Sequence, residues 1–343
     1  MAKTNPGNFF EDYTLGQRIE HAVPRTVSGG ERALYHALYP ARHALHSSDE
    51  FARACGLPGA PLDDLAAFHV VFGKTVPDVS LNAVANLGYA EGRFRKPVYP
   101  GDTLRSVSEV IGLKQNSNGK SGVVYVRTEG LNQRDEVVLD YVRWVMVRKR
   151  DLDAAAPETV IPALSKVVPA DSLVIPAGLD FTNYDFTLAG EPHRWSDYRV
   201  GEIIDHVDGV TIEEAEHMMA TRLWQNTAKV HFDATFRPDG QRLIYGGHVI
   251  SMARALSFNG LANAQVIAGI NAGAHANPCF AGDTVKAWTE VLDKAETAAP
   301  GVGALRLRLV ATKGGVAGDL RGEDGKYLPD VLLDLDYWAL MPT

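Results

Sequence analysis

Residues 97–110 read Pro-Val-Tyr-Pro-Gly-Asp-Thr-Leu-Arg-Ser-Val-Ser-Glu-Val, and residues 278–291 read Pro-Cys-Phe-Ala-Gly-Asp-Thr-Val-Lys-Ala-Trp-Thr-Glu-Val. The first Pro, the Gly-Asp-Thr triplet and the last Glu-Val are in register. Two further matches keep the same order: Asp12-Tyr13-Thr14-Leu15-Gly16 returns as Asp197-Tyr198-Arg199-Val200-Gly201, and Leu139-Asp140 before Trp144 returns as Leu333-Asp334 before Trp338. Collinear matches of this kind indicate a tandem duplication with diverged copies. A candidate functional residue that is present in one copy alone therefore indicates which copy holds the functional site.

The duplication divides the chain into two copies, 1–150 and 181–343. Residues 151–180 contain four prolines and little amphipathic period, which is typical of a linker. Each copy has one apolar helix followed by β-rich runs that are bounded by Gly, Pro, Asn or Asp, which indicates an α+β fold with an antiparallel sheet around a long helix. The expected helices are 49–54, 65–76 and 248–262; the expected strands are 93–98, 103–113, 122–130, 137–147, 266–272, 284–292, 303–312 and 332–340.

Composition narrows the class of protein. Hydrophobic residues make up 45% and charged residues 22%, as in an ordinary globular chain. The net charge of −8 argues against nucleic acid or an anionic membrane as the main partner. With only Cys55 and Cys279, neither a disulfide framework nor a metal cluster is expected. No secretory signal and no run of about 20 apolar residues is present, so we expect a cytoplasmic protein.

A stretch that overlaps the first repeated segment resembles a motif of a known family. The stretch Arg93-Phe94-Arg95-Lys96-Pro97-Val98-Tyr99-Pro100-Gly101-Asp102-Thr103-Leu104 closely resembles the Arg-Phe-x-x-Pro-Val-x-x-Gly-Asp-Thr-Leu strand pair of the MaoC-like dehydratases, relatives of the (R)-specific enoyl-CoA hydratases. The resemblance implies a tandem, or double, hotdog fold, in which each half is an antiparallel sheet wrapped around a long central helix. We expect the two sheets to lie side by side, so that one chain imitates a homodimer of single-hotdog relatives.

The same family carries an Asp-x-Asn-Pro-x-His motif before the central helix. A histidine lies at this place in both copies, His46 and His231, but Asn226 stands at the acidic position before His231 and Ala41 stands there before His46. The stretch Leu243-Ile244-Tyr245-Gly246-Gly247-His248-Val249 matches the family's helix start. It places Gly247 on the glycine whose N–H, at a helix N-terminus, binds a thioester oxyanion. The first copy has Leu62-Asp63-Asp64-Leu65 instead, which favours the second copy as the catalytic half and the first as the pocket-shaping half.

The reaction implied is the reversible hydration of an α,β-unsaturated acyl-CoA. It needs a base for water, an acid for Cα and donors for the enolate oxygen. A histidine can serve in either proton step, whereas the Asn226 amide can only position water or substrate. The missing proton carrier is Asp233 or Asp49, or His231 acts twice. Both aspartates also suit helix capping, which is their ordinary role at a helix start.

Over the whole chain the resemblance implies mesaconyl-CoA as substrate, in the ethylmalonyl-CoA pathway. Besides the thioester, mesaconyl-CoA has a free carboxylate, which a selective enzyme would bind with a cation. Arg42, four residues before His46, and Arg222, four residues before Asn226, are the candidates. Arg95 and its basic neighbours could hold phosphates of coenzyme A, and Tyr245 belongs to the helix-start motif. Coenzyme A is part of the substrate, and no separate cofactor is expected. We expect a homodimer or higher homo-oligomer.

Two other functions remain open at this stage. Hotdog proteins also include acyl-CoA thioesterases, and a buried Asp63 or Asp64 could supply the base that such an enzyme needs. A non-catalytic acyl-CoA binding protein would explain the loss of the acidic residues. His69, His217 and His275 lack motif support and are interpreted as structural.

Overall fold

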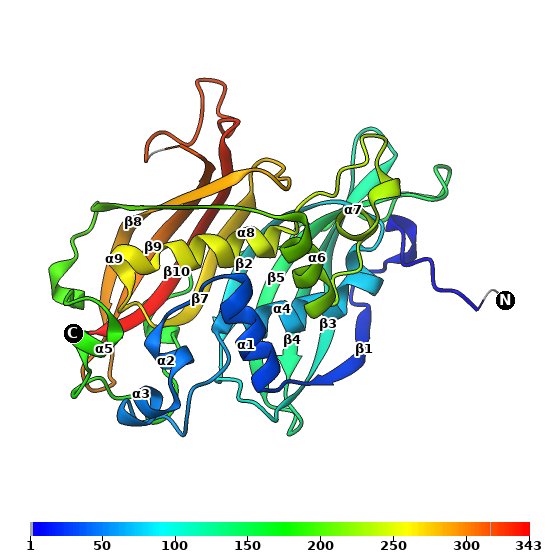
Figure 1. The fold of residues 1–343 in the computed structure, drawn as a ribbon. Coiled ribbons are helices and arrows are strands. Elements are labelled where there is room, and N and C mark those ends of the chain that lie inside the picture. The colour runs from blue at the N-terminus through cyan, green and yellow to red at the C-terminus, as the bar shows by residue number, and fades with distance from the viewer. Residues whose placement is uncertain (1–2, 316) are drawn as a thin grey trace.

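The computed structural model describes residues 3–315 and 317–343. Its sheet has the order β1-β3-β4-β5-β2-β7-β10-β9-β8-β6, so that five strands from each copy form one antiparallel surface (Figure 1). The strands of the first copy are β1 (Arg18–Thr26), β2 (Ala83–Phe94), β3 (Thr103–Gln115), β4 (Ser121–Leu131) and β5 (Val137–Arg148). Those of the second are β6 (Ile203–Thr211), β7 (Val266–His275), β8 (Thr284–Glu296), β9 (Val302–Lys313) and β10 (Val331–Pro342).

The two halves join where β2 pairs with β7 in antiparallel register, with Tyr89 opposite Gly273 and Gly92 opposite Ile270. The pairing consumes the edge of each half-sheet, which would otherwise leave unpaired backbone groups. The prediction that the two sheets lie side by side is confirmed. A Cβ on Gly92 would lie 3.0 Å from the Ile270 side chain, so the small residue permits this close approach.

One long helix covers each half of the same sheet face, α4 (Asp64–Thr75) in the first copy and α8 (Gly246–Leu256) in the second (Figure 1). Eleven residues of α4 are buried, which agrees with its nearly uninterrupted apolar sequence. In both copies, a backbone hydrogen bond joins the residue two positions before the long helix to the segment that leads into the repeated Gly-Asp turn. The Leu62 N–H donates to the Val98 carbonyl at 2.8 Å, and the Ile244 N–H donates to the Cys279 carbonyl at 2.9 Å. Asp64 and Gly246 therefore hold equivalent first positions of α4 and α8.

Shorter helices flank this pair. They are α1 (Gly29–Leu38), α2 (Ala44–Ser47), α3 (Asp49–Ala54), α5 (Phe186–Ala189), α6 (Glu214–Leu223), α7 (Lys229–Phe232) and α9 (Phe258–Leu261), with a π-helical turn η2 (Val76–Ser80) and 3-10 turns η1 (Phe10–Asp12), η3 (Ala170–Ser172), η4 (Trp195–Asp197) and η5 (Ala234–Phe236). The largest core cluster contains side chains of both copies, including Tyr35, Phe68, Trp224 and Tyr245. The halves thus share one core.

Residues 151–180 cross the sheet on the face opposite α4 and α8. On β10, the Tyr337 ring faces Arg254 of α8, and the next side chain, Trp338, donates its indole N–H to the Val168 carbonyl at 3.0 Å. Successive side chains of a strand point to opposite faces. Both faces of β10 are consequently covered at Tyr337 and Trp338, and both side chains are buried.

Two predicted elements have wrong bounds. The strand expected over 93–98 is β2, Ala83–Phe94, whose Ala, Asn and Gly residues have low β propensity and hide it in the sequence. The helix expected over 248–262 is α8 followed by α9, with a break at Asn259 and Gly260, where Gly260 has φ +98°. A left-handed glycine ends an α-helix because no Cβ opposes that conformation.

Candidate active site

A cavity of about 290 Å³ opens beside the start of α8. Its walls come from both copies. The second copy supplies α7, Asn226, the residues before α8 and the end of β7, whereas the first copy supplies η2 and strands β2 and β5. The β2–β7 pairing brings these walls together, so neither copy could form the cavity alone.

His231 of α7 lines this cavity and is partly buried. Its Nδ1 lies 2.7 Å from the carbonyl oxygen of Leu243. A carbonyl can only accept, so Nδ1 carries the proton and Nε2 is the nitrogen with a free lone pair in the neutral ring. Burial lowers the pKa of His231, and the Leu243 carbonyl opposes this in part. The ring is therefore neutral at pH 7 and ready to accept a proton.

The first turn of α8 forms another part of the wall. Gly246 lines the cavity, and a Cβ there would lie 2.4 Å from Cε1 of His275. Gly247 is buried behind it, and the ring of Tyr245 fills the space that a Cβ would need. The first N–H groups of a helix have no intrahelical acceptor and carry the positive end of the helix dipole. The helix start can thus bind a developing oxyanion.

Asn226 is buried on the cavity wall, where its Oδ1 accepts from the Ala228 N–H at 3.3 Å. The two aspartates considered as proton carriers lie elsewhere. Asp233 is exposed and accepts from the backbone N–H and the hydroxyl of Thr235, at 2.9 and 2.7 Å. Asp49 is exposed and accepts from the Ala60 N–H at 3.0 Å. Asp233 thus caps η5, and Asp49 ties α3 to Ala60 and to Arg32, with which it forms an ion pair at 3.0 Å.

The charge in the cavity is positive. Within the described ranges, the residues that line it include neither Asp nor Glu, whereas Arg143 lies in the wall and Lys229 is exposed beside His231. Such a lining attracts anions. Tyr245, expected to contact substrate, also lines the cavity, and its hydroxyl lies 3.1 Å from Nδ1 of His69.

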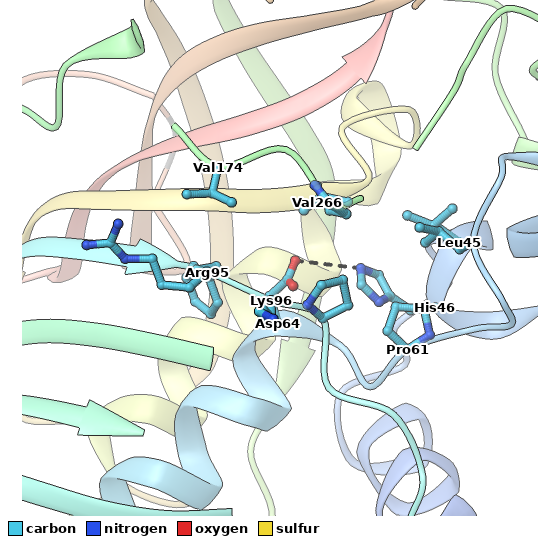
Figure 2. A pocket seen from close by; sticks show the side chains of 12 residues that line it. Leu45, His46, Pro61, Asp64, Arg95, Lys96, Val174 and Val266 are labelled. Atoms are coloured by element: carbon cyan, nitrogen blue, oxygen red, sulfur yellow. Dashed lines mark ion pairs between the residues drawn. The ribbon is translucent and has the colours of Figure 1, made fainter. Parts of the chain in front are cut away.

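The equivalent pocket in the first copy is much smaller, and Figure 2 shows the residues that line it. His46 and Asp64 face one another there, with Nε2 and Oδ2 3.7 Å apart, and the remaining space is about 20 Å³. That volume holds about one water. His46 Nε2 also donates to the Gln265 carbonyl at 2.9 Å, and burial raises the pKa of Asp64 to about 6. Asp63 caps α4 through the Leu65 N–H at 2.9 Å.

The arginines expected to bind substrate do not line the large cavity. Arg42 is exposed, with its guanidinium 4.3 Å from the Phe258 ring centroid, and Arg222 is exposed on α6. Arg95 borders the small first-copy pocket (Figure 2). Its Nε donates to Asp140 at 2.5 Å. Asp140 thus neutralises the charge that a phosphate would have needed.

The sequence analysis did not predict several polar residues on the cavity wall, among them Asn86, Tyr89, Arg143 and His275. His275 was interpreted as structural, yet its Nε2 lies 3.2 Å from the Tyr89 hydroxyl within the cavity lining. His69 and His217 are fully buried in the core. One signal was available: Arg143 interrupts an apolar strand one residue before Trp144, whereas the repeat has Tyr337 before Trp338.

In the described part of the chain, no cluster of three or more His, Cys, Asp or Glu side chains is arranged to hold a metal ion. None of the described helices combines the length and apolar character needed to cross a membrane.

Comparison with known proteins agrees with the geometry. Residues 1–315 match the family model described as mesaconyl-CoA hydratase. The chain is 79% identical over 341 residues to mesaconyl-CoA hydratase of Cereibacter sphaeroides and 60% identical over 349 residues to β-methylmalyl-CoA dehydratase of Chloroflexus aurantiacus, with 99% of each chain covered in both cases.

Solved structures show the same fold. A putative MaoC domain dehydratase from Chloroflexus aurantiacus superposes with a TM-score of 0.97 at 60% identity and covers 100% of this chain and 99% of its own. A Mycobacterium tuberculosis protein described as having a double hotdog fold gives a TM-score of 0.75 at 25% identity, with 98% of both chains covered. The predicted double hotdog is confirmed.

Proposed function

Because this chain belongs to the mesaconyl-CoA hydratase family, we propose that it is a hydro-lyase that reversibly adds water to mesaconyl-CoA and forms β-methylmalyl-CoA. The observation that carries the proposal is the contact of His231 Nδ1 with the Leu243 carbonyl, which leaves Nε2 as the ring nitrogen free to act as base. The glycine start of α8 lines the same cavity. A base and an oxyanion site together suit water addition to an unsaturated thioester.

In the hydration direction, Nε2 of His231 removes a proton from water while the oxygen attacks the carbon β to the thioester. The double-bond electrons move toward the thioester carbonyl, whose oxygen becomes negative and is stabilised by N–H groups at the start of α8. Asn226 holds the water or the carbonyl through its amide. The enolate then collapses and Cα takes a proton.

His231 acts twice in this scheme, first as base and then, in its protonated form, as the acid that delivers the proton to Cα. Asp233 and Asp49 are exposed and do not line the large cavity, which supports this choice over either carboxylate. A histidine with a pKa below its ordinary value releases the proton readily, which assists the second step.

We assign the catalytic half to residues 181–343 and the pocket-shaping half to residues 1–150, with residues 151–180 as linker. The difference between the two cavities, about 290 and about 20 Å³, supports this division. We further propose that the protein acts in the cytoplasm as a homodimer or higher homo-oligomer. Sedimentation of the purified chain measures the assembly directly.

Incubation with mesaconyl-CoA tests the proposed reaction against the two alternatives. Hydration removes the absorbance of the conjugated thioester without releasing a thiol. A thioesterase would release free coenzyme A thiol, and a binding protein would change neither signal. The lack of Asp and Glu among the described lining residues of the large cavity favours hydration, since a hotdog thioesterase normally uses a carboxylate to activate water.

A further inference from the structure

Arg143 is an arginine with an incomplete set of partners. Its side chain is fully buried, and it lies in the wall of the large cavity. Nη2 donates to the Thr75 hydroxyl at 2.7 Å and more weakly to Ser80 at 3.5 Å. Nε and Nη1 have no hydrogen-bond partner, and within the described residues no carboxylate pairs with the guanidinium. A buried charge without an anion is costly, so this arrangement indicates a missing ligand.

The duplication provides an internal comparison. In the first copy the Arg143 guanidinium of β5 lies 4.2 Å from the Phe72 ring centroid of α4. In the second copy the positions are exchanged, and Arg254 of α8 lies 6.0 Å from the Tyr337 ring centroid of β10. Arg254, however, donates to the Ser257 hydroxyl and the Ala264 carbonyl. The second-copy arginine is satisfied inside the protein, whereas Arg143 is not.

A neighbour of Arg143 on the next strand also has buried polar atoms without hydrogen-bond partners among the residues that the structure describes. Asn86 and Tyr89 of β2 pair with Val145 and Arg143 of β5, which places all these side chains on one face of the sheet. The buried amide atoms of Asn86 also lack partners. Unpaired donors from two adjacent strands therefore meet in one wall of the cavity.

This wall is close to the reaction site. Tyr89, directly opposite Arg143, reaches Nε2 of His275 at 3.2 Å, and His275 lies against Gly246 at the start of α8. The charge of Arg143 also acts on the hydroxyl of Tyr245, where it opposes the rise in pKa that burial causes. An anion on Arg143 would thus lie across the cavity from the helix start that receives the thioester.

We propose that Arg143 binds the free carboxylate of the substrate and makes the enzyme specific for an unsaturated acyl-CoA with a second carboxylate. The assignment rests on the proposed hydratase function. The unpaired N–H groups of Nη1 donate to the carboxylate oxygens, and the Asn86 amide supplies a further donor. The carboxylate is attached to the carbon that water attacks, so this contact also orients that carbon toward His231.

The test compares two substrates that differ at that carboxylate alone. Mesaconyl-CoA carries it, and (E)-2-methylcrotonyl-CoA has a methyl group in its place. For Arg143→Leu we expect the ratio of kcat/KM for mesaconyl-CoA over that for the methyl analogue to fall by roughly 100-fold or more. The variant lacks the guanidinium, which in the wild type binds the carboxylate and is left unpaired by the methyl group. Arg143→Lys keeps the charge without the fork and should lower the ratio by about tenfold. Free guanidinium should partly restore mesaconyl-CoA turnover in Arg143→Ala.

Arg254→Leu is the matched control, because it removes the equivalent arginine with internal partners and should leave the substrate ratio unchanged even if stability falls. If Arg143→Leu does not fold, the ratio measured for Arg143→Lys decides. Equal losses on both substrates would overturn the assignment, because that result is expected if Arg143 stabilises the fold or binds a phosphate of coenzyme A. A wild-type enzyme that leaves the conjugated thioester unchanged overturns the hydratase proposal itself, together with this one.

Discussion

The imidazole Nδ1 of His231 lies 2.7 Å from the carbonyl oxygen of Leu243, twelve positions further along the chain and just before α8. This contact determines which ring nitrogen is protonated, because the carbonyl cannot donate. It also connects α7 to the segment that carries the oxyanion site. The base and the helix start are thereby held in a fixed relation.

The pH dependence of the reaction follows from this histidine. Burial lowers the pKa of His231 below the ordinary histidine value of 6.5, so the neutral base persists below that pH. We expect log kcat/KM in the hydration direction to be flat near pH 7 and to fall by about one unit per pH unit once the pH drops below the lowered pKa. A pH–rate profile of the wild type measures this. An acid limb centred above 6.5 would contradict the assignment.

Replacement of the histidines separates the two copies. His231→Ala should lower turnover by about two to four orders of magnitude with the fold intact, which is the usual effect of losing a general acid or base. His46→Ala, its first-copy equivalent, should have a smaller effect, because His46 lies in a pocket of about 20 Å³. Steady-state rates and circular dichroism of both variants provide the comparison. The reverse order of effects would move the active site to the first copy.

Gly246→Ala tests the helix start. The added Cβ would lie 2.4 Å from the ring of His275, so either the ring or the first turn of α8 must shift. We expect kcat to fall by about 100-fold, the effect of losing one oxyanion donor. Gly29→Ala is a matched control at the first position of α1, where a Cβ meets nothing within 4 Å. Wild-type turnover in Gly246→Ala would contradict the expectation that the first turn of α8 must keep its position for catalysis.

Asp64 makes stability depend on pH. Burial raises its pKa from 3.8 to about 6 in the folded protein, so between these values the folded state binds more protons than the unfolded state. The free energy of unfolding then falls as pH rises through this window, by up to about 3 kcal/mol. Asp64→Asn, which can still accept from the Ile267 N–H, should remove the loss and be the more stable form at pH 7.

Urea denaturation at pH 4 and pH 7 measures this difference. The two proteins should have similar stability at the lower pH and diverge at the higher one. If Asp64→Asn is instead less stable at pH 7, the pair with His46 must hold the aspartate ionised.

Several parts of this protein follow from the sequence alone, because they depend on local interactions. The Gly-Asp turns, the apolar runs of β3, β4, β5, β8, β9 and β10, and the buried helix α4 appear where the pattern predicts them. Each needs only contacts between residues near in the chain, or a periodicity that one element shows by itself. The repeat also predicted that the second sheet would continue the first.

The tertiary structure decided the composition of the site. Arg143 and His231 belong to different copies and come together because β2 pairs with β7, and β2 has a small-residue sequence that does not predict a strand. The same packing closes the His46 pocket and leaves the His231 cavity open, although both copies carry the histidine. Cavity volume and unpaired buried charge depend on side chains distant in sequence, and these meet only when the two halves share one core.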